Sequence, residues 1–157
     1  MNISGITLCD GGIADLDSVM KVMDDSFDPR FGEAWTASQC AGLLPMPGVW
    51  LTLARETGDT IGFALARAVA GEAELLLLAV RRPAQGRGIG KMLLDDFTEQ
   101  AKGRGATRLH LEVREGNHAL SLYEGEAFSL VGRRRNYYSG HGGLTYDALT
   151  LAKNAPG

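Results

Sequence analysis

Cysteine and histidine are scarce: the 157-residue chain contains only Cys9, Cys40 and 3 histidines. Two isolated cysteines form neither a disulfide framework nor a metal-ligand spacing, which excludes a disulfide-stabilised scaffold and leaves no metal site to argue. No basic region followed by an apolar core opens the chain, and no apolar run reaches the length of a membrane span. We therefore expect a cytoplasmic protein that does not enter membranes.

Neither sign of charge dominates the chain. It has 16 Lys and Arg against 19 Asp and Glu, a formal net charge of −3, although three arginines cluster at residues 133–135. This balance argues against a dedicated nucleic-acid binder. The length predicts one domain, residues 1–153, large enough to bury a full core, followed by a short tail at residues 154–157.

Hydrophobic periodicity predicts strands and helices in mixed order. Apolar residues at helical spacing indicate an amphipathic helix over residues 13–27. Thr36 with Gln39 three residues later has the pattern of a capping box, which starts a short helix. Strands are expected at residues 3–9, 49–55, 61–69, 74–80, 108–114, 129–135 and 146–151, with further helices from residue 89 and after residue 117.

The most informative stretch is VRRPAQGRGIGKM, residues 80–92, which joins an apolar strand to an amphipathic helix. We expect the strand to be buried on both faces because its apolar run is continuous. Gly86, Gly88 and Gly90 lack a Cβ, so successive backbone N–H groups can turn toward one anion. The helix that begins near Ile89 adds its unpaired N-terminal donors and the positive end of its dipole.

Two cations strengthen this interpretation of the turn. Arg87 and Lys91 place full charges beside the glycines, and the natural guest is a diphosphate. A Walker loop requires Ser or Thr after the lysine, where this chain has Met92. A dinucleotide fingerprint requires a third glycine at position 91. Both of these phosphate loops therefore fit poorly.

The motif that the turn does match is Q/R-x-x-G-x-G/A, and with it the chain resembles the GNAT family of N-acetyltransferases. The matching residues are Gln85, Gly86, Arg87, Gly88, Ile89 and Gly90. The resemblance implies an α/β GNAT fold, with a mixed, mostly antiparallel twisted sheet flanked by helices, and acetyl-CoA as co-substrate. It further implies a pyrophosphate site on the loop, including Lys91, and pantetheine contacts from Leu78, Ala79, Val80 and Asn117.

The second half of the chain is similar to the RimI-type ribosomal-protein-alanine N-acetyltransferases. The residues that carry this similarity are Leu111, Glu112, Val113, Arg114, Asn117, Ala119, Leu122, Tyr123, Glu124, Arg134, Asn136, Tyr137 and Tyr138. It implies that Glu112 is the general base and Tyr123 the acid that protonates the departing thiolate. The alternatives are a strand glutamate paired with Arg114 or Lys102, and a packed core tyrosine.

The acceptor is less clearly indicated than the co-substrate. The resemblance implies that Trp35, Arg134, Asn136, Tyr137 and Tyr138 border the acceptor groove. Residues 27–35 are longer than the corresponding RimI segment, which leaves two acceptors open. These are the N-terminal amine of a protein, such as a ribosomal protein, and a small-molecule amine. A third interpretation is a catalytically silent acyl-CoA sensor, against which Glu112 and Tyr123 both argue.

Overall fold

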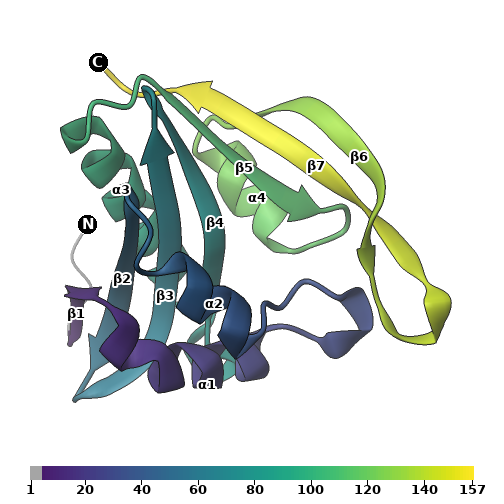
Figure 1. The fold of residues 1–157 in the computed structure, drawn as a ribbon, viewed down its shortest axis with the longest axis horizontal. Coiled ribbons are helices and arrows are strands. Elements are labelled where there is room, and N and C mark those ends of the chain that lie inside the picture. Colours follow the sequence, from purple (N-terminus) through teal and green to yellow (C-terminus); the bar gives the residue numbers. More distant parts are fainter. Residues whose placement is uncertain (1–4) are drawn as a thin grey trace.

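The computed structural model describes residues 5–157 and contains one seven-stranded sheet with helices on both faces (Figure 1). The strand order is β1-β2-β3-β4-β5-β7-β6, and among the described strands only β4 and β5 pair in parallel. The mixed, mostly antiparallel sheet predicted from the sequence is therefore confirmed. The strands are β1 Ile6–Gly11, β2 Val49–Glu56, β3 Asp59–Val69, β4 Glu72–Val80, β5 Arg108–Arg114, β6 Ser129–Ser139 and β7 Thr145–Asn154. The α-helices are α1 Leu16–Ser26, α2 Ala37–Leu43, α3 Ile89–Gly103 and α4 Ala119–Gly125.

The predicted helix starts are confirmed where local chemistry defines them. The Thr36 hydroxyl accepts from the Gln39 N–H at 3.1 Å, and the Gln39 side chain accepts from the Thr36 N–H at 2.8 Å. This reciprocal pair is the predicted capping box, and it satisfies donors at the start of α2. The first strand is observed from Ile6; residues 3 and 4 of its predicted range lie outside the described residues.

The last two strands are longer than the sequence predicts. β6 extends to Ser139 rather than to residue 135, and β7 runs to Asn154, which we expected in the tail. β6 is an edge strand, at the end of the sheet opposite β1, and is mostly exposed on both faces, with Leu130 and Val131 each more than half exposed. An edge strand exposed on both faces needs no alternation of apolar and polar residues. The alternation used to predict this strand therefore ended before the strand itself does.

The core lies in two layers, one on each face of the sheet. Helices α1 and α2 pack on one face, where they bury side chains such as Leu53 and Phe63. Helices α3 and α4 pack on the other face, which buries Ala64 and Leu111. Figure 1 shows α1 and α2 in front of the sheet. Because side chains alternate between faces, each central strand contributes to both layers.

A bulge at Leu76 changes the direction of β4. Leu75 pairs with Ala66 and Leu77 pairs with Leu65, so Leu76 is an extra residue on β4. Leu75 consequently packs on the α3 side and Leu77 on the α1 side. A bulge bends its strand and increases the local twist. We infer that this bend turns the rest of β4 away from β5.

The parallel ladder ends at this bulge. β4 and β5 are paired from Glu72 with Arg108 only as far as Leu75 with Leu111. The sheet therefore opens before residues 78–80, the residues that the family resemblance assigns to the pantetheine arm. The prediction that β4 is buried on both faces is wrong: beyond the bulge, Leu76, Leu78 and Val80 are only half-buried, because they line the opening.

Among residues 5–157, no helix combines the length and the hydrophobicity that crossing a membrane requires.

Candidate active site

A cavity of about 750 Å³ occupies the opening between β4 and β5. Its walls come from β4, the glycine-rich turn, β5, α4, the end of β6 and the loop between α1 and α2. The site residues predicted from the sequence that line it are Trp35, Leu78, Ala79, Val80, Gln85, Gly86, Gly88, Ile89, Gly90, Glu112, Asn117, Tyr123, Tyr137 and Tyr138. Those outside the lining are Arg87, Lys91, Arg134 and Asn136.

The glycine-rich turn presents a run of free backbone donors to the cavity. Gly86 and Gly88 have φ of +80° and +84°, the left-handed region that glycine adopts without strain. Within the described part of the chain, the N–H groups of residues 86–91 find no hydrogen-bond acceptor. They lie at the N-terminus of α3, whose dipole favours negative charge. This arrangement suits a phosphate or diphosphate.

The two predicted cations of the turn are already paired with carboxylates. Arg87 donates to both oxygens of Glu56, at 3.1 and 2.6 Å. Lys91 contacts Asp95 at 2.7 Å and Glu126 at 2.8 Å. The hydrogen bonds from Arg87 lower the pKa of Glu56, so that carboxylate is charged at neutral pH. The anion site therefore consists mainly of backbone amides and the helix terminus.

Two further groups define the phosphate end of the cavity. Gln85 donates its side-chain amide to the Val80 carbonyl at 2.9 Å, which ties the turn to the end of β4. Arg82 lines the cavity with an exposed side chain. Arg82 was not predicted as a binding residue from the sequence, although it is a cation within the stretch at residues 80–92.

Glu112 points into the cavity from the centre of β5. Its neighbours Leu111 and Val113 are 1% and 5% exposed and pack in the core, so strand alternation directs Glu112 to the opposite face as predicted. Its Oε2 atom is buried and has no hydrogen bond. The Arg134 Nε atom lies 3.3 Å away, close enough for an ion pair but not aligned for a hydrogen bond.

The expected alternative partners of Glu112 bind elsewhere. Arg114 pairs with Glu33, and Lys102 approaches Glu99 at 4.0 Å. A buried carboxylate oxygen normally has a donor, and the exceptions concentrate at functional sites. Glu112 is therefore placed to accept a hydrogen bond or a proton from a molecule in the cavity.

Tyr123 lies on α4 and is 6% exposed. Its ring packs edge-on against Phe128, with centroids 6.1 Å apart, and its carbonyl accepts from the Phe128 N–H. Ala127 makes this chain reversal with φ of +71°, a conformation that usually calls for glycine. Burial raises the pKa of Tyr123 well above its ordinary value. Its hydroxyl is consequently protonated throughout the neutral range.

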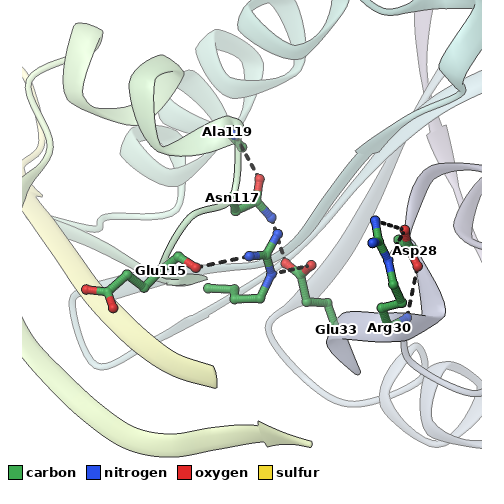
Figure 2. A network of polar contacts seen from close by, with 7 residues as sticks. Asp28, Arg30, Glu33, Glu115, Asn117 and Ala119 are labelled. Atoms are coloured by element: carbon green, nitrogen blue, oxygen red, sulfur yellow. Dashed lines mark hydrogen bonds and ion pairs between the residues drawn. The ribbon is translucent and has the colours of Figure 1, made fainter. Parts of the chain in front are cut away.

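A polar network that was not predicted from the sequence lies at the cavity (Figure 2). The Glu33 carboxylate accepts from the Arg114 Nε at 2.9 Å and from the Asn117 side-chain amide at 2.6 Å. The Asn117 side-chain oxygen in turn accepts from the Ala119 N–H at 2.8 Å. Glu33 and Arg114 are 81 residues apart in the chain, so no local pattern could have paired them.

The predicted acceptor residues separate into two groups. Tyr137 and Tyr138 line the cavity, with their rings edge-on at 5.0 Å. Arg134 approaches Glu112 from outside the lining. Asn136 has φ of +54°, and its backbone N–H donates to Asp147, so it shapes the bulge of β6 rather than the cavity wall.

This geometry agrees with the comparison to known proteins. Residues 16–126 match the model of the acetyltransferase (GNAT) family. The crystal structure of the ribosomal-protein-S18-alanine N-acetyltransferase from Escherichia coli superimposes with a TM-score of 0.85 at 27% identity, covering 97% of this chain and 95% of that one. The chain therefore belongs to the GNAT acetyltransferase family.

Curated relatives narrow the similarity within the family. The [Ribosomal protein bS18]-alanine N-acetyltransferase of Haemophilus influenzae is 41% identical over 97 residues, which span 62% of this chain and 66% of that protein, just under two thirds of its length. The N-alpha-acetyltransferase RimI of Mycobacterium tuberculosis is 33% identical over 147 residues, covering 90% of this chain and 84% of that protein. Within the GNAT family, the chain is thus RimI-like.

The contact between Arg87 and Glu56 gives a first prediction. We expect Arg87→Ala to weaken coenzyme A binding by no more than about 10-fold: a charge-assisted hydrogen bond contributes about 1.5–3 kcal/mol, but Arg87 must first give up its contact with Glu56. Glu56→Gln should strengthen binding, since it removes the carboxylate that competes for Arg87. Isothermal titration calorimetry measures both effects. Arg108→Ala is the control, because Arg108 contacts Asn154 outside the cavity. Equal affinity of Arg87→Ala and the unmodified protein would contradict a role for Arg87 in the phosphate site.

Proposed function

We propose that this protein transfers the acetyl group of acetyl-CoA to the N-terminal α-amine of a protein. The observation that carries the proposal is the position of Glu112: a buried carboxylate oxygen that has no hydrogen bond, and only the exposed Arg134 as an ion-pair partner, faces the same cavity as the amides of the glycine-rich turn. A group that can accept a proton and a site that suits a diphosphate thus share one cavity.

The residues of the phosphate end fit acetyl-CoA. The free N–H groups of residues 86–91 would hold the pyrophosphate, with Arg82 as a flanking charge. The edge of β4 at residues 78–80 has no strand partner on the β5 side among the described residues, so its backbone can bind the amides of the pantetheine arm. When bound, acetyl-CoA supplies an acetyl thioester with a thiolate leaving group.

Glu112 would receive the proton of the attacking amine. An N-terminal amine has a pKa of about 7.7–8.0 and lysine one of about 10.4, so at about pH 7.5 roughly a third of the former and roughly one in a thousand of the latter is neutral. A carboxylate base therefore suffices for an N-terminal acceptor. Arg134 is 61% exposed, so an incoming amine can take its place beside Glu112 without displacing core residues.

Tyr123 would donate a proton to the departing sulfur. A phenol has a pKa of about 10 and a thiol one of about 8.5, but burial raises the pKa of Tyr123 further. The hydroxyl is then protonated when the thiolate forms, and hydrogen bonding from it stabilises the developing negative charge. One proton leaves the amine for Glu112 and one leaves Tyr123 for the sulfur, and passage of the proton from Glu112 to the Tyr123 phenolate through solvent restores both groups, so that the net transfer is from the amine to the sulfur.

Direct transfer without an acetyl-enzyme fits the nucleophiles that are present. Neither Cys9 nor Cys40 lines the cavity, and burial raises the pKa of the Cys40 thiol. Ser26 does line the cavity, but its hydroxyl donates to the Val80 carbonyl at 2.9 Å. No base among the described residues activates it, so we assign the attack to the acceptor amine itself.

The choice of a protein N-terminus is supported by the relatives. Proteins named as bS18-alanine N-acetyltransferases are 41% and 37% identical to matched segments of this chain. The acceptor side of the cavity is bordered by aromatic side chains, among them Trp35, Tyr137 and Tyr138. Such side chains provide rigid contact area and polar edges for an extended peptide end.

Two panels of acceptors, one of short peptides and one of small amines, test the proposed function directly. We expect acetyl-CoA consumption with short peptides that carry a free Ala, Ser or Met N-terminus, and no consumption once that terminus is blocked. Turnover of small amines alone would agree with an acetyltransferase activity but would contradict a protein N-terminus as the acceptor. Absence of turnover with either panel, despite coenzyme A binding, would favour a sensor.

Glu112→Gln tests the base. We expect kcat to fall by about 10²–10⁴-fold while the affinity for acetyl-CoA is unchanged, because the amide keeps the shape of the side chain but cannot accept the proton. Steady-state kinetics measure kcat, and calorimetry measures the affinity for acetyl-CoA. Glu99→Gln is the matched control, since that carboxylate lies on α3 with its side chain 75% exposed. Unchanged kcat in Glu112→Gln would remove Glu112 from the mechanism.

A further inference from the structure

One wall of the cavity is a loop that belongs to neither the phosphate turn nor the catalytic strand. Residues 28–33 follow α1, and four of them line the cavity: Asp28, Arg30, Phe31 and Glu33. This loop lies on the same side of the cavity as Tyr137 and Tyr138, because its backbone contacts the end of β6.

Backbone packing holds the loop against the end of the β6–β7 hairpin. Gly32 has φ of +68°, and a Cβ there would lie 2.1 Å from the Ser139 carbonyl oxygen. A Cβ on Gly140 would lie 1.6 Å from the Arg30 carbonyl oxygen. Both glycines are needed for this close approach of two backbones. In Figure 1 the loop reaches from α1 to the β6–β7 hairpin.

The side chain of Glu33 makes a second attachment between this loop and the rest of the protein. Its side chain is 8% exposed, and the side chain of its ion-pair partner Arg114 is 9% exposed. The Arg114 guanidinium also lies over the Phe31 ring, 3.7 Å from its centroid, and donates to the Glu115 carbonyl. Phe31 in turn packs edge-on against Tyr146 at 5.2 Å. A planar guanidinium can make these contacts together, which an ammonium cannot.

The two partners of Glu33 belong to the elements that carry the proposed base and acid. Arg114 lies two residues after Glu112 on β5, and Asn117 precedes α4, which carries Tyr123. One carboxylate therefore joins the loop to both elements (Figure 2). Each of its oxygens already accepts a hydrogen bond, which favours positioning over proton transfer.

We propose that Glu33 is a positioning residue for the acceptor. Its buried carboxylate fixes the wall formed by residues 28–33 relative to Glu112 and Tyr123, and the wall fixed in this way binds the acceptor chain next to its reacting amine. The phosphate end of the acetyl-CoA site does not depend on Glu33, because Glu33 binds Arg114 and Asn117 and makes no contact with the amides of residues 86–91. The proposal rests on the proposed function for the identity of the acceptor.

Glu33→Gln separates the two substrates kinetically. The new amide group would face an N–H donor of either Arg114 or Asn117, so one of the two contacts must break. We expect the acceptor KM to rise about tenfold or more while the acetyl-CoA KM stays within about twofold, since one partner of a buried, hydrogen-bonded charge pair is lost. Glu115→Gln is the matched control: it makes the same chemical change beside Arg114, on a side chain that pairs with Arg133 and does not line the cavity.

Gly32→Ala tests the wall without touching the ion pair. The added methyl group must push the loop from Ser139, so the acceptor KM should rise with the acetyl-CoA KM unchanged. If Glu33→Gln does not fold, as judged by circular dichroism, Gly32→Ala decides alone. An acceptor KM within twofold of the unmodified protein, or equal rises in both KM values, would overturn the proposal. The assay uses whichever acceptor panel is turned over, so failure of the peptide panel is a separate result.

Discussion

The cavity depends on β4 leaving its parallel partner. Up to Leu75, β4 forms a regular ladder with β5. The extra residue at Leu76 then bends β4 and reverses which face each following side chain occupies. Beyond that point β4 and β5 are not paired, and the opening between them is the seam that holds the cavity. A seam with unpaired backbone groups is costly unless something binds there, and the glycine-rich turn adds a second set of free donors at its end. The backbone alone therefore forms a binding site, independently of the catalytic side chains.

We propose different roles for two largely buried glutamate side chains that line this seam, because their partners differ. Glu33 is satisfied by Arg114 and Asn117, so it binds structure together. Glu112 is similarly enclosed, with 18% of its side chain exposed, but one of its oxygens has no hydrogen bond. The same functional group is therefore a positioning element in one place and a candidate base in the other, and Arg114, the nearest strand cation to Glu112 in sequence, serves the former.

The sequence could predict what depends on neighbours along the chain. The start of α3, the capping box at Thr36 and the inward face of β5 all follow from local spacing, and each is observed. Contacts between distant segments were not predictable in this way: the pairing of Glu33 with Arg114, and of Arg87 with Glu56, depends on how the elements pack. The bulge at Leu76 was hidden because a run of leucines has no polar residue to mark the change of face.

The central claim is that the open seam and the glycine-rich turn form the acetyl-CoA site. Amide hydrogen exchange, followed with and without saturating acetyl-CoA, tests it most directly, because it monitors the backbone N–H groups themselves. The account predicts slower exchange at residues 78–80 and 86–91 on binding, since these groups gain acceptors, with little change along α1 and α2. Unchanged exchange at the turn in the presence of bound acetyl-CoA would contradict it.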